Sequence, residues 1–384
     1  MAPRLRSLPV TAAAVAAALA VGVALRRTHL WSDGRPLPIR GADGRPVAGS
    51  ISEKVVLDVH GTRQGMILQS RDGSQPVLLF LHGGMPEYVL TERYPTGLEN
   101  AFTVAWWEQR GAGLSYTPDL PRETLTSAQL IADALVVTDY LRERFGVEKI
   151  YLMAHSGGTF FGLQVAAQAP ERYHAYIGIA QIVDQRRSEA EAYQYMLRRF
   201  QELGDTRMVR RLRSAPATVA DGTPPAYLRV RDTAMHRLGV GTTRDMRSVL
   251  PGVFWPSLRS PQYTPAEKVR TWRGKIASGV SSLWEETLAT DLAVKVPEVD
   301  LPLYLFHGIH DQTCSYALAR EYLETVTAPV KAFYTFPRSA HSPFLEEPEA
   351  VLRILREDVL MGRTDLADGA ARRGPAAGDL EINS

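Results

Sequence analysis

The stretch IYLMAHSGGTFFGLQVAAQA, residues 150–169, decides the fold. It begins with an apolar run that is typical of a strand buried on both faces, and from Thr159 onward it predicts a helix. Between the two lies Ser156, with the small residues Ala154 and Gly158 two positions before and after it. A serine on a sharp strand-to-helix turn needs small neighbours, because other backbone approaches closely there, and the turn exposes the hydroxyl. The stretch therefore predicts a strand, a tight turn that presents a serine, and a helix.

Similar apolar runs recur along the chain and alternate with amphipathic helical segments such as residues 127–145. Strands interleaved with helices of this length predict an α/β fold with a mainly parallel central sheet and helices on both faces. The runs are residues 77–81, 102–107, 175–183, 303–306 and 330–336. Residues 51–59 and 63–70, on either side of Gly61, are expected to form a leading antiparallel pair.

The alternation is interrupted once, and this interruption defines the predicted domains. Residues 184–297 are helical in pattern and far too long for an ordinary connection, so we expect an inserted helical lid there. The core then consists of residues 51–183 and 298–361. Residues 31–50 are rich in Gly, Pro and Arg and are predicted to be a linker. Residues 362–384 have almost no large apolar side chain and are predicted to be a disordered tail.

The N-terminus, residues 1–30, differs from the rest of the chain. Arginines flank an uncharged, alanine-rich run, residues 10–25, on both sides. Basic residues followed by an apolar run predict a signal peptide or a signal anchor. We therefore expect an exported protein that is either anchored in a membrane through residues 10–25 or secreted after cleavage. The pair of arginines directly after the run favours the anchor.

The composition of the 384-residue chain excludes some classes of function. Its 44 basic and 42 acidic residues leave a formal net charge of +2, which gives no reason to expect a nucleic-acid partner. Cys314 is the single cysteine, so neither an intrachain disulfide nor a cysteine-based metal site can form. Nothing in the sequence suggests a metal or an organic cofactor. The expected partner is a small-molecule or short-peptide substrate.

A second glycine-rich turn, His82-Gly83-Gly84, follows the apolar run of residues 77–81. Acyl transfer builds negative charge on the carbonyl oxygen, and two preorganised backbone N–H groups can stabilise that oxyanion. Glycine lets the backbone face a substrate without an intervening Cβ. We therefore predict an oxyanion hole formed by the N–H groups of Gly84 and Gly157.

The residues needed to activate Ser156 follow later strands. Asp311 comes after the run of residues 303–306, and His341 comes after the last run. A serine is a poor nucleophile until a histidine removes its proton, and that histidine needs a carboxylate to fix its tautomer. We therefore predict Ser156 as nucleophile, His341 as base and Asp311 as the orienting acid. Asp184, which ends an earlier strand, is the alternative acid.

Three other histidines lie near these predicted residues in the sequence. His155, directly before the serine, is expected to contribute to packing. His307 and His310 precede Asp311 and are expected to be structural or to line the pocket.

Two motifs resemble the proline iminopeptidase branch (peptidase family S33-type) of the α/β-hydrolases. The segment HGGMP, residues 82–86, is similar to the family's His-Gly-Gly-Pro-Gly. The segment WEQRGAGLS, residues 107–115, resembles the family's Trp-Asp-Gln-Arg-Gly-x-Gly-x-Ser. The resemblance covers residues 51–183 and 302–360. It implies the α/β-hydrolase fold, in which nucleophile, acid and base follow one another in this order.

The chain departs from that family where the substrate would bind. Met85 breaks the first motif, Glu108 replaces aspartate in the second, and Gly157 stands where the peptidases usually carry tryptophan. Prolyl aminopeptidases of this type hold the free amine of the substrate with acidic lid residues. Glu189 and Glu191 are the candidates here. We predict a substrate pocket that includes Met85, Glu189 and Trp255.

The leading hypothesis is a serine hydrolase that forms an acyl-enzyme and resembles a proline iminopeptidase, an aminopeptidase acting on N-terminal residues. A carboxylesterase of unknown substrate is the first alternative. A non-catalytic binding protein on the same fold is the second, although a pure binder has no need of a complete set of nucleophile, base and acid.

Overall fold

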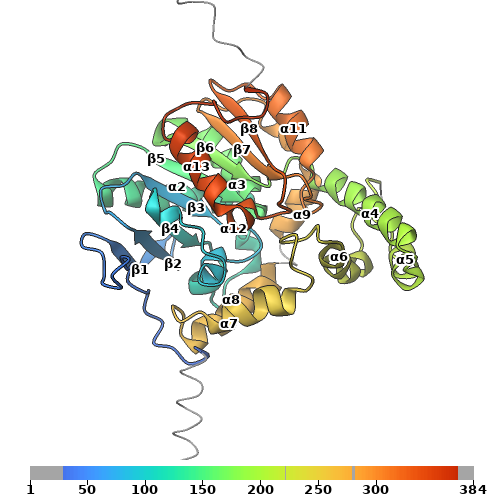
Figure 1. Cartoon of the computed structure of the whole chain (residues 1–384), viewed down its shortest axis with the longest axis horizontal. Helices are drawn as coiled ribbons and strands as arrows, with labels where there is room; N and C mark the ends of the chain where they lie inside the picture. The colour runs from blue at the N-terminus through green and yellow to red at the C-terminus, as the bar shows by residue number, and fades with distance from the viewer. Residues whose placement is uncertain (1–28, 221, 279–281, 371–384) are drawn as a thin grey trace, which may run out of the picture.

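The computed structural model describes residues 29–220, 222–278 and 282–370. Their centre is a sheet of eight strands in the order β1-β2-β4-β3-β5-β6-β7-β8 (Figure 1). The strands are β1 (Ile51–Val59), β2 (Thr62–Ser70), β3 (Val77–Leu81), β4 (Thr103–Glu108), β5 (Ile150–His155), β6 (Tyr173–Ile179), β7 (Leu303–Gly308) and β8 (Lys331–Phe336). The predicted leading pair is confirmed: β1 pairs with β2 antiparallel, and β2 pairs antiparallel with β4. All other neighbours are parallel.

The register of the parallel strands brings their carboxyl ends to one edge of the sheet. Leu81 at the end of β3 pairs with Ala154 of β5, and Ala154 pairs with Gly178 of β6. Ile179 in turn pairs with Phe306 of β7. The loops that follow β3, β5, β7 and β8 therefore leave the sheet on the same side, which is where open α/β sheets bind their ligands.

Both faces of the sheet are covered, as the continuous apolar runs predict. All five residues of β3 are buried and alternate between two hydrophobic clusters, with Leu79 in one and Phe80 in the other. The first cluster is covered by helices α2 (Ser127–Phe145), α3 (Gly157–Gln168) and α11 (Tyr316–Thr325). The second is covered by α12 (Pro343–Glu346), α13 (Pro348–Ile354) and the loop after β3.

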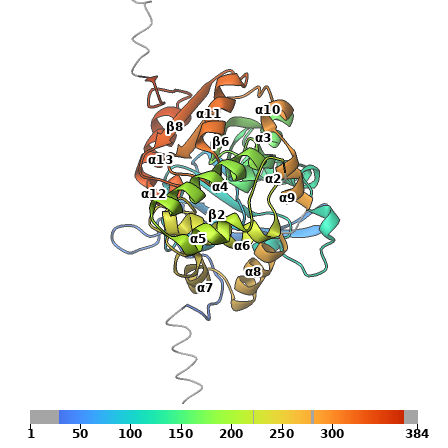
Figure 2. The same ribbon diagram turned by 90° about the vertical axis from the view of Figure 1, so that its right-hand side faces the viewer.

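The chain leaves the sheet after β6 and returns at β7, and the described residues between them contain helices and no strand of the sheet. We call residues 184–297 the helical insertion. Its elements are α4 (Gln185–Glu202), α5 (Thr206–Arg213), α6 (Pro225–Leu238), a π-helical turn (Leu250–Phe254), α7 (Trp255–Arg259), α8 (Pro265–Ser278), α9 (Ser282–Ala289) and α10 (Leu292–Lys295). Figure 1 shows α4–α6 beside the sheet and α7 and α8 below it, and Figure 2 shows α4–α6 from the side. Its role as a lid stays a prediction.

The segment that we expected to be a linker lies against the helical insertion. The backbone N–H of Leu37 donates to Oε1 of Gln262 at 3.1 Å, and Nζ of Lys268 donates to the carbonyl oxygen of His29 at 2.5 Å. Between residues 29 and 50 the chain has no helix or strand of its own. Leu37 thus bonds to the helical insertion, and the role of residues 31–50 as a linker stays a prediction.

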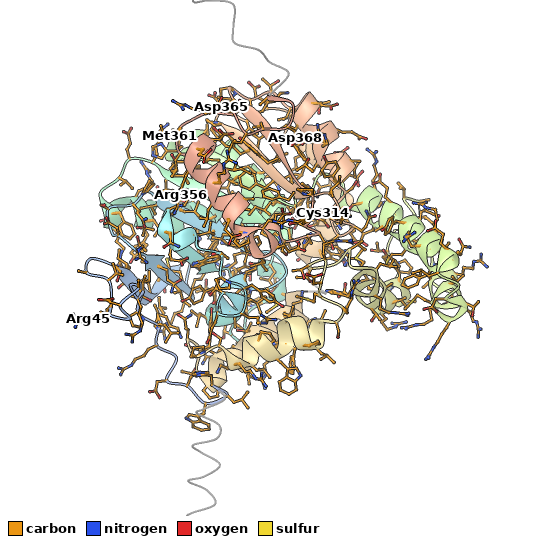
Figure 3. All side chains as sticks on the ribbon, in the orientation of Figure 1. Arg45, Cys314, Arg356, Met361, Asp365 and Asp368 are labelled. Carbon is orange, nitrogen blue, oxygen red and sulfur yellow. The ribbon has the colours of Figure 1, made fainter. Side chains whose placement is uncertain are left out.

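The predicted disordered tail is also corrected for its first residues. Residues 362–370 are described and packed, while residues 371–384 lie outside the described part of the chain. The backbone N–H of Asp368 donates to the carbonyl oxygen of Phe333, and an Asp368 oxygen accepts from the N–H of Thr335. Asp368 therefore satisfies backbone groups of the edge strand β8 that would otherwise face solvent (Figure 3).

The predicted export and membrane anchoring are corrected as well. A spanning helix needs about 20 consecutive apolar residues. Among residues 29–220, 222–278 and 282–370, no helix is both long and apolar enough to cross a membrane. The longest of them, α2, has 19 residues and carries several charged side chains. The run on which the prediction rested, residues 10–25, lies outside the described residues, and we withdraw the prediction.

A buried ion pair explains the arginine of the WEQRG motif. Nε and one terminal nitrogen of Arg110 donate to the two carboxylate oxygens of Asp133 on α2, at 2.6 and 2.9 Å. Asp133 also accepts from Gln64 and Gln129, and its oxygen lies 2.8 Å from Nδ1 of His60. The pair ties the loop after β4 to α2 and to the β1–β2 turn.

We expect Asp133→Ala to lower the free energy of unfolding by about 3–5 kcal/mol, because it leaves the guanidinium of Arg110 buried without its carboxylate. Asp139→Ala on the same helix is the matched control. Asp139 pairs with arginines at the surface, so its loss should cost about 0–1 kcal/mol. Urea unfolding measures both, and equal small losses would contradict the structural role of Arg110 and Asp133.

Candidate active site

The turn between β5 and α3 holds Ser156 in a strained backbone conformation. Its φ is 52° and its ψ is −125°, values that a non-glycine residue rarely adopts. Gly158 makes the turn possible, because a Cβ at that position would lie 2.4 Å from the carbonyl oxygen of Leu81. A small residue is therefore required two positions after the serine, as predicted, because β3 approaches the turn closely there. Strain of this kind is typical of functional residues.

The loop after β3 lies directly against this turn. A Cβ on Gly83 would lie 2.8 Å from Cβ of Ser156, and a Cβ on Gly157 would lie 4.0 Å from the backbone nitrogen of Gly84. The N–H of Gly83 already donates to Oε1 of Glu87 at 3.1 Å. This engagement of Gly83 favours Gly84 as the partner of Gly157, as predicted. The N-terminus of α3 adds its dipole at the same place.

The loops after β7 and β8 bring Asp311 and His341 together. Nδ1 of His341 lies 2.8 Å from Oδ2 of Asp311, and both side chains are buried. The other oxygen of Asp311 accepts from the backbone N–H groups of Thr313 and Cys314 at 2.7 and 3.1 Å. Gly308 allows the two loops to meet, since a Cβ there would lie 1.9 Å from the carbonyl oxygen of Ala340. The carboxylate is thus fixed by its own loop and faces the imidazole.

The electrostatics of this pair suit a proton acceptor. Burial opposes ionisation of Asp311, but the charge of His341 and hydrogen bonds from His307 and His341 hold the pKa of the Asp311 carboxyl well below its ordinary value. Burial lowers the pKa of His341, against the opposing effect of Asp311. An ionised carboxylate beside a neutral imidazole is the arrangement that a general base requires.

The alternative acid, Asp184, is a helix cap and does not contact His341 in any hydrogen bond found among the described residues. Its side chain caps α4 by accepting from the backbone N–H of Arg187 at 2.9 Å. Nε2 of His307, by contrast, lies 3.3 Å from Oδ2 of Asp311, so this histidine supports the carboxylate. The structure brings Asp311 to His341 and leaves Asp184 as a helix cap.

Asp311, Cys314 and His341 also offer potential metal ligands within 4.8 Å of one another. Two of the three are already hydrogen-bonded to each other. Burial and the charge of Asp311 raise the pKa of the Cys314 thiol, and a protonated thiol is a poor ligand. The donor set therefore fits a proton-transfer pair better than a metal centre.

Comparison with known proteins decides the family. The model of the alpha/beta hydrolase fold family matches residues 76–348, which include Ser156, Asp311 and His341. The chain belongs to the α/β-hydrolase fold family. It is accordingly a hydrolase, and the predicted fold class is confirmed.

This hydrolase is similar to individual proteins whose names or folds are known. It is 29% identical over 310 residues to the "Probable aminopeptidase YbaC" of Bacillus subtilis (strain 168), covering 79% of this chain and 95% of the relative. Its fold is similar to that of a proline iminopeptidase-related protein of Thermus thermophilus, with a TM-score of 0.56 at 20% identity over 82% of this chain and 99% of that one. The proline iminopeptidase of Mycobacterium smegmatis gives 0.54 at 17% identity, over 81% and 100%.

The two acidic residues of the insertion differ in their surroundings, and their part in substrate binding stays a prediction. Glu189 is fully buried and forms a bidentate ion pair with Arg231, with both N–O distances at 2.7 Å. Tyr227 and Gln185 donate to the same carboxylate. Glu191 accepts from the hydroxyl of Ser315 near the surface. Both carboxylates therefore have partners within the protein.

The other predicted pocket residues differ in their surroundings. Met85 is buried in the hydrophobic cluster that Phe80 belongs to, directly after the glycine turn of residues 82–84. Trp255 is 48% exposed on α7, with its ring against that of Phe254. Membership of either residue in a substrate pocket stays a prediction.

Residue-by-residue reading of the sequence missed two contributions to the site. His155, expected only to pack, lies 2.8 Å from Oε1 of Glu87 and 3.0 Å from the carbonyl oxygen of His341. Lys275 on α8 reaches the glycine turn of residues 82–84, since a Cβ on Gly84 would lie 2.8 Å from its Nζ. Neither position carries a local sequence signal, because both contacts join segments that are far apart in the chain.

The ion pair of Glu189 leads to a prediction about substrate binding. Glu189→Gln should lower the free energy of unfolding by about 3 kcal/mol, since it removes a buried partner of Arg231. It should change KM equally for substrates with a free and with a blocked α-amine. Glu191→Gln is the control and should change neither quantity. A selective rise of KM for free-amine substrates in Glu189→Gln would show that Glu189 binds the amine after all.

Proposed function

We propose that this hydrolase is a serine hydrolase that forms an acyl-enzyme on Ser156 and acts as an aminopeptidase on N-terminal residues. One observation carries the proposal: a strained, partly exposed serine shares one edge of the sheet with the buried Asp311–His341 pair and the glycine loop after β3. The similarity to a relative named as a probable aminopeptidase supports the substrate class.

In the first half of the reaction, Nε2 of His341 takes the proton of the Ser156 hydroxyl while Oγ attacks the scissile carbonyl carbon. The N–H groups of Gly84 and Gly157 stabilise the resulting oxyanion. The C–N bond then breaks, His341 gives its proton to the departing amine, and Ser156 carries the acyl group. In the second half, His341 takes a proton from water, whose oxygen attacks the ester, and returns that proton to Ser156.

A carboxylesterase is the second candidate, and a specific observation favours it. The bidentate pairing of Glu189 with Arg231 leaves that carboxylate satisfied, although the resemblance to prolyl aminopeptidases assigns the substrate amine to an acidic residue of this kind. A panel of aminoacyl-arylamides and nitrophenyl esters of matched acyl groups separates the two. An aminopeptidase should cleave arylamides that have a free α-amine. It should no longer cleave them once that amine is acetylated. Turnover of the esters alone would decide for the esterase.

We expect a fluorophosphonate probe to label Ser156, because an activated serine attacks phosphorus while ordinary serines do not. Peptide mapping by mass spectrometry locates the adduct. Ser156→Ala is the test variant, and Ser342→Ala, which removes a buried hydroxyl in the His341 loop, is the matched control. Labelling that persists in Ser156→Ala would move the nucleophile elsewhere.

We expect Asp311→Asn to preserve the fold and to lower kcat by about 10⁴-fold, since an amide holds the wrong tautomer of His341. Asp184→Asn should be nearly neutral, because asparagine caps a helix as well as aspartate does. Combining Asp311→Asn with His341→Ala should cost little more than either change alone, as members of one catalytic unit are not additive. If Asp184→Asn is the crippling change, the acid is misassigned.

A further inference from the structure

A buried chain of hydrogen bonds joins the oxyanion loop to the predicted base. Oε1 of Glu87, in the short helical turn Glu87–Leu90, accepts from the N–H of Gly83 at 3.1 Å and lies 2.8 Å from Nδ1 of His155. Nε2 of His155 lies 3.0 Å from the carbonyl oxygen of His341. Glu87 and His155 are 6% and 4% exposed. Both ring nitrogens of the buried His155 therefore have partners within the protein.

The chemistry of these partners restricts where the protons can lie. A carbonyl oxygen only accepts, so Nε2 of His155 must carry a proton to bond to His341. An ionised Glu87 carboxylate can only accept, so the group that its Oε1 meets at His155 must be a second N–H donor beside that of Gly83. Nδ1 of His155 then carries a proton too. A cationic ring beside a carboxylate also avoids the cost of burying either charge alone.

We propose that His155 is held as an imidazolium by the Glu87 carboxylate, and that this ion pair positions the backbone of His341 and keeps the His341 ring neutral. The inference rests on the proposed function, because it assigns His341 as the base. His155 and Glu87 act through His341 and touch no reacting atom, so they are positioning residues.

The electrostatic part follows from the arrangement of the rings. The ring centroids of His155 and His341 lie 4.8 Å apart, so the cation is close to the base, and the Glu87 carboxylate bonds to Nδ1 of His155, the ring nitrogen that does not bond to His341. A nearby cation disfavours protonation of His341, and His155 is among the groups that lower the pKa of His341, after burial. The base is then neutral, and active, down to a lower pH.

Other charged groups face the same residues. Asp311 and His307 from the end of β7 adjoin His341. Glu346 on α12 accepts from the N–H of Ala340 at 2.9 Å, and burial raises its pKa to about 7. On the other side, His82 and Lys275 lie within the electrostatic influence of Glu87. A test by pH must therefore separate Glu87 from Glu346.

The decisive variant is Glu87→Gln, measured by the pH dependence of kcat/KM. Glutamine has the shape of glutamate, and its amide can donate to Nδ1 of a neutral His155, so the hydrogen bond to His341 survives while the ion pair is lost. The acid limb of the profile should move to higher pH by roughly 0.5–1 unit, since the nearer of two opposed charges dominates. An unshifted limb with a lower plateau would overturn the proposal and leave a structural role only.

Two controls test whether the shift of the acid limb is caused by Glu87 itself. Glu92→Gln neutralises an exposed carboxylate five residues along the same segment and should leave the limb in place. Glu346→Gln removes the group whose pKa is about 7, and adding Glu87→Gln to it should still shift the limb. A shift that disappears in the Glu346→Gln background would assign the effect to Glu346 and overturn the proposal.

A measurement on the unaltered full chain covers the case in which Glu87→Gln does not fold. Nitrogen-15 NMR of the histidine rings should find both nitrogens of His155 protonated at pH 7. The ring is assigned through its contact with Phe344, whose ring centroid lies 4.9 Å away. A neutral His155 would overturn the proposal. Fluorophosphonate labelling of the same sample is the independent check, because absent labelling of Ser156 refutes the proposed function whatever the state of His155.

Discussion

The structure depends on the close approach of three backbone segments around Ser156. The turn after β5 can reverse sharply only because Gly158 has no Cβ to collide with the carbonyl oxygens of Leu81 and His82. Adding a methyl group there would push β3 away from α3 and would displace the glycine loop. The strained φ of 52° at Ser156 is maintained by the sheet on one side and the helix on the other. The proposed nucleophile and the proposed oxyanion donors both depend on this single packing constraint.

Charge in the site is organised around the same constraint. On one side of His341 lies the Asp311 carboxylate, which is held by backbone N–H groups of its own loop. The pair of Glu87 and His155 contacts the backbone of His341 and so connects the glycine loop to the loop that carries His341. The ring is therefore held through both its side chain and its backbone. Such double support keeps a base within the small positional error that proton transfer tolerates.

The parts of the fold and site that the sequence predicts are those with local signals. The apolar runs predict the strands, and the turns around Gly84, Ser156 and His341 lie at strand ends that a parallel sheet brings together. Pairings across the chain carry no such signal: Glu87 and His155 are 68 residues apart, and Glu189 and Arg231 are 42 apart. A buried partner changes what a side chain can do, and the partners of His155 and Glu189 could not be predicted because they lie far away in the sequence.

The central claim is that Ser156 becomes covalently acylated during turnover. The most direct measurement is rapid quenching of the hydrolase with a slowly deacylating activated ester, followed by mass spectrometry of the peptides. The account predicts a burst of leaving group equal to the enzyme concentration and a peptide containing Ser156 that is heavier by the mass of the acyl group. Product formation with no adduct, or an adduct on any other residue, would contradict it.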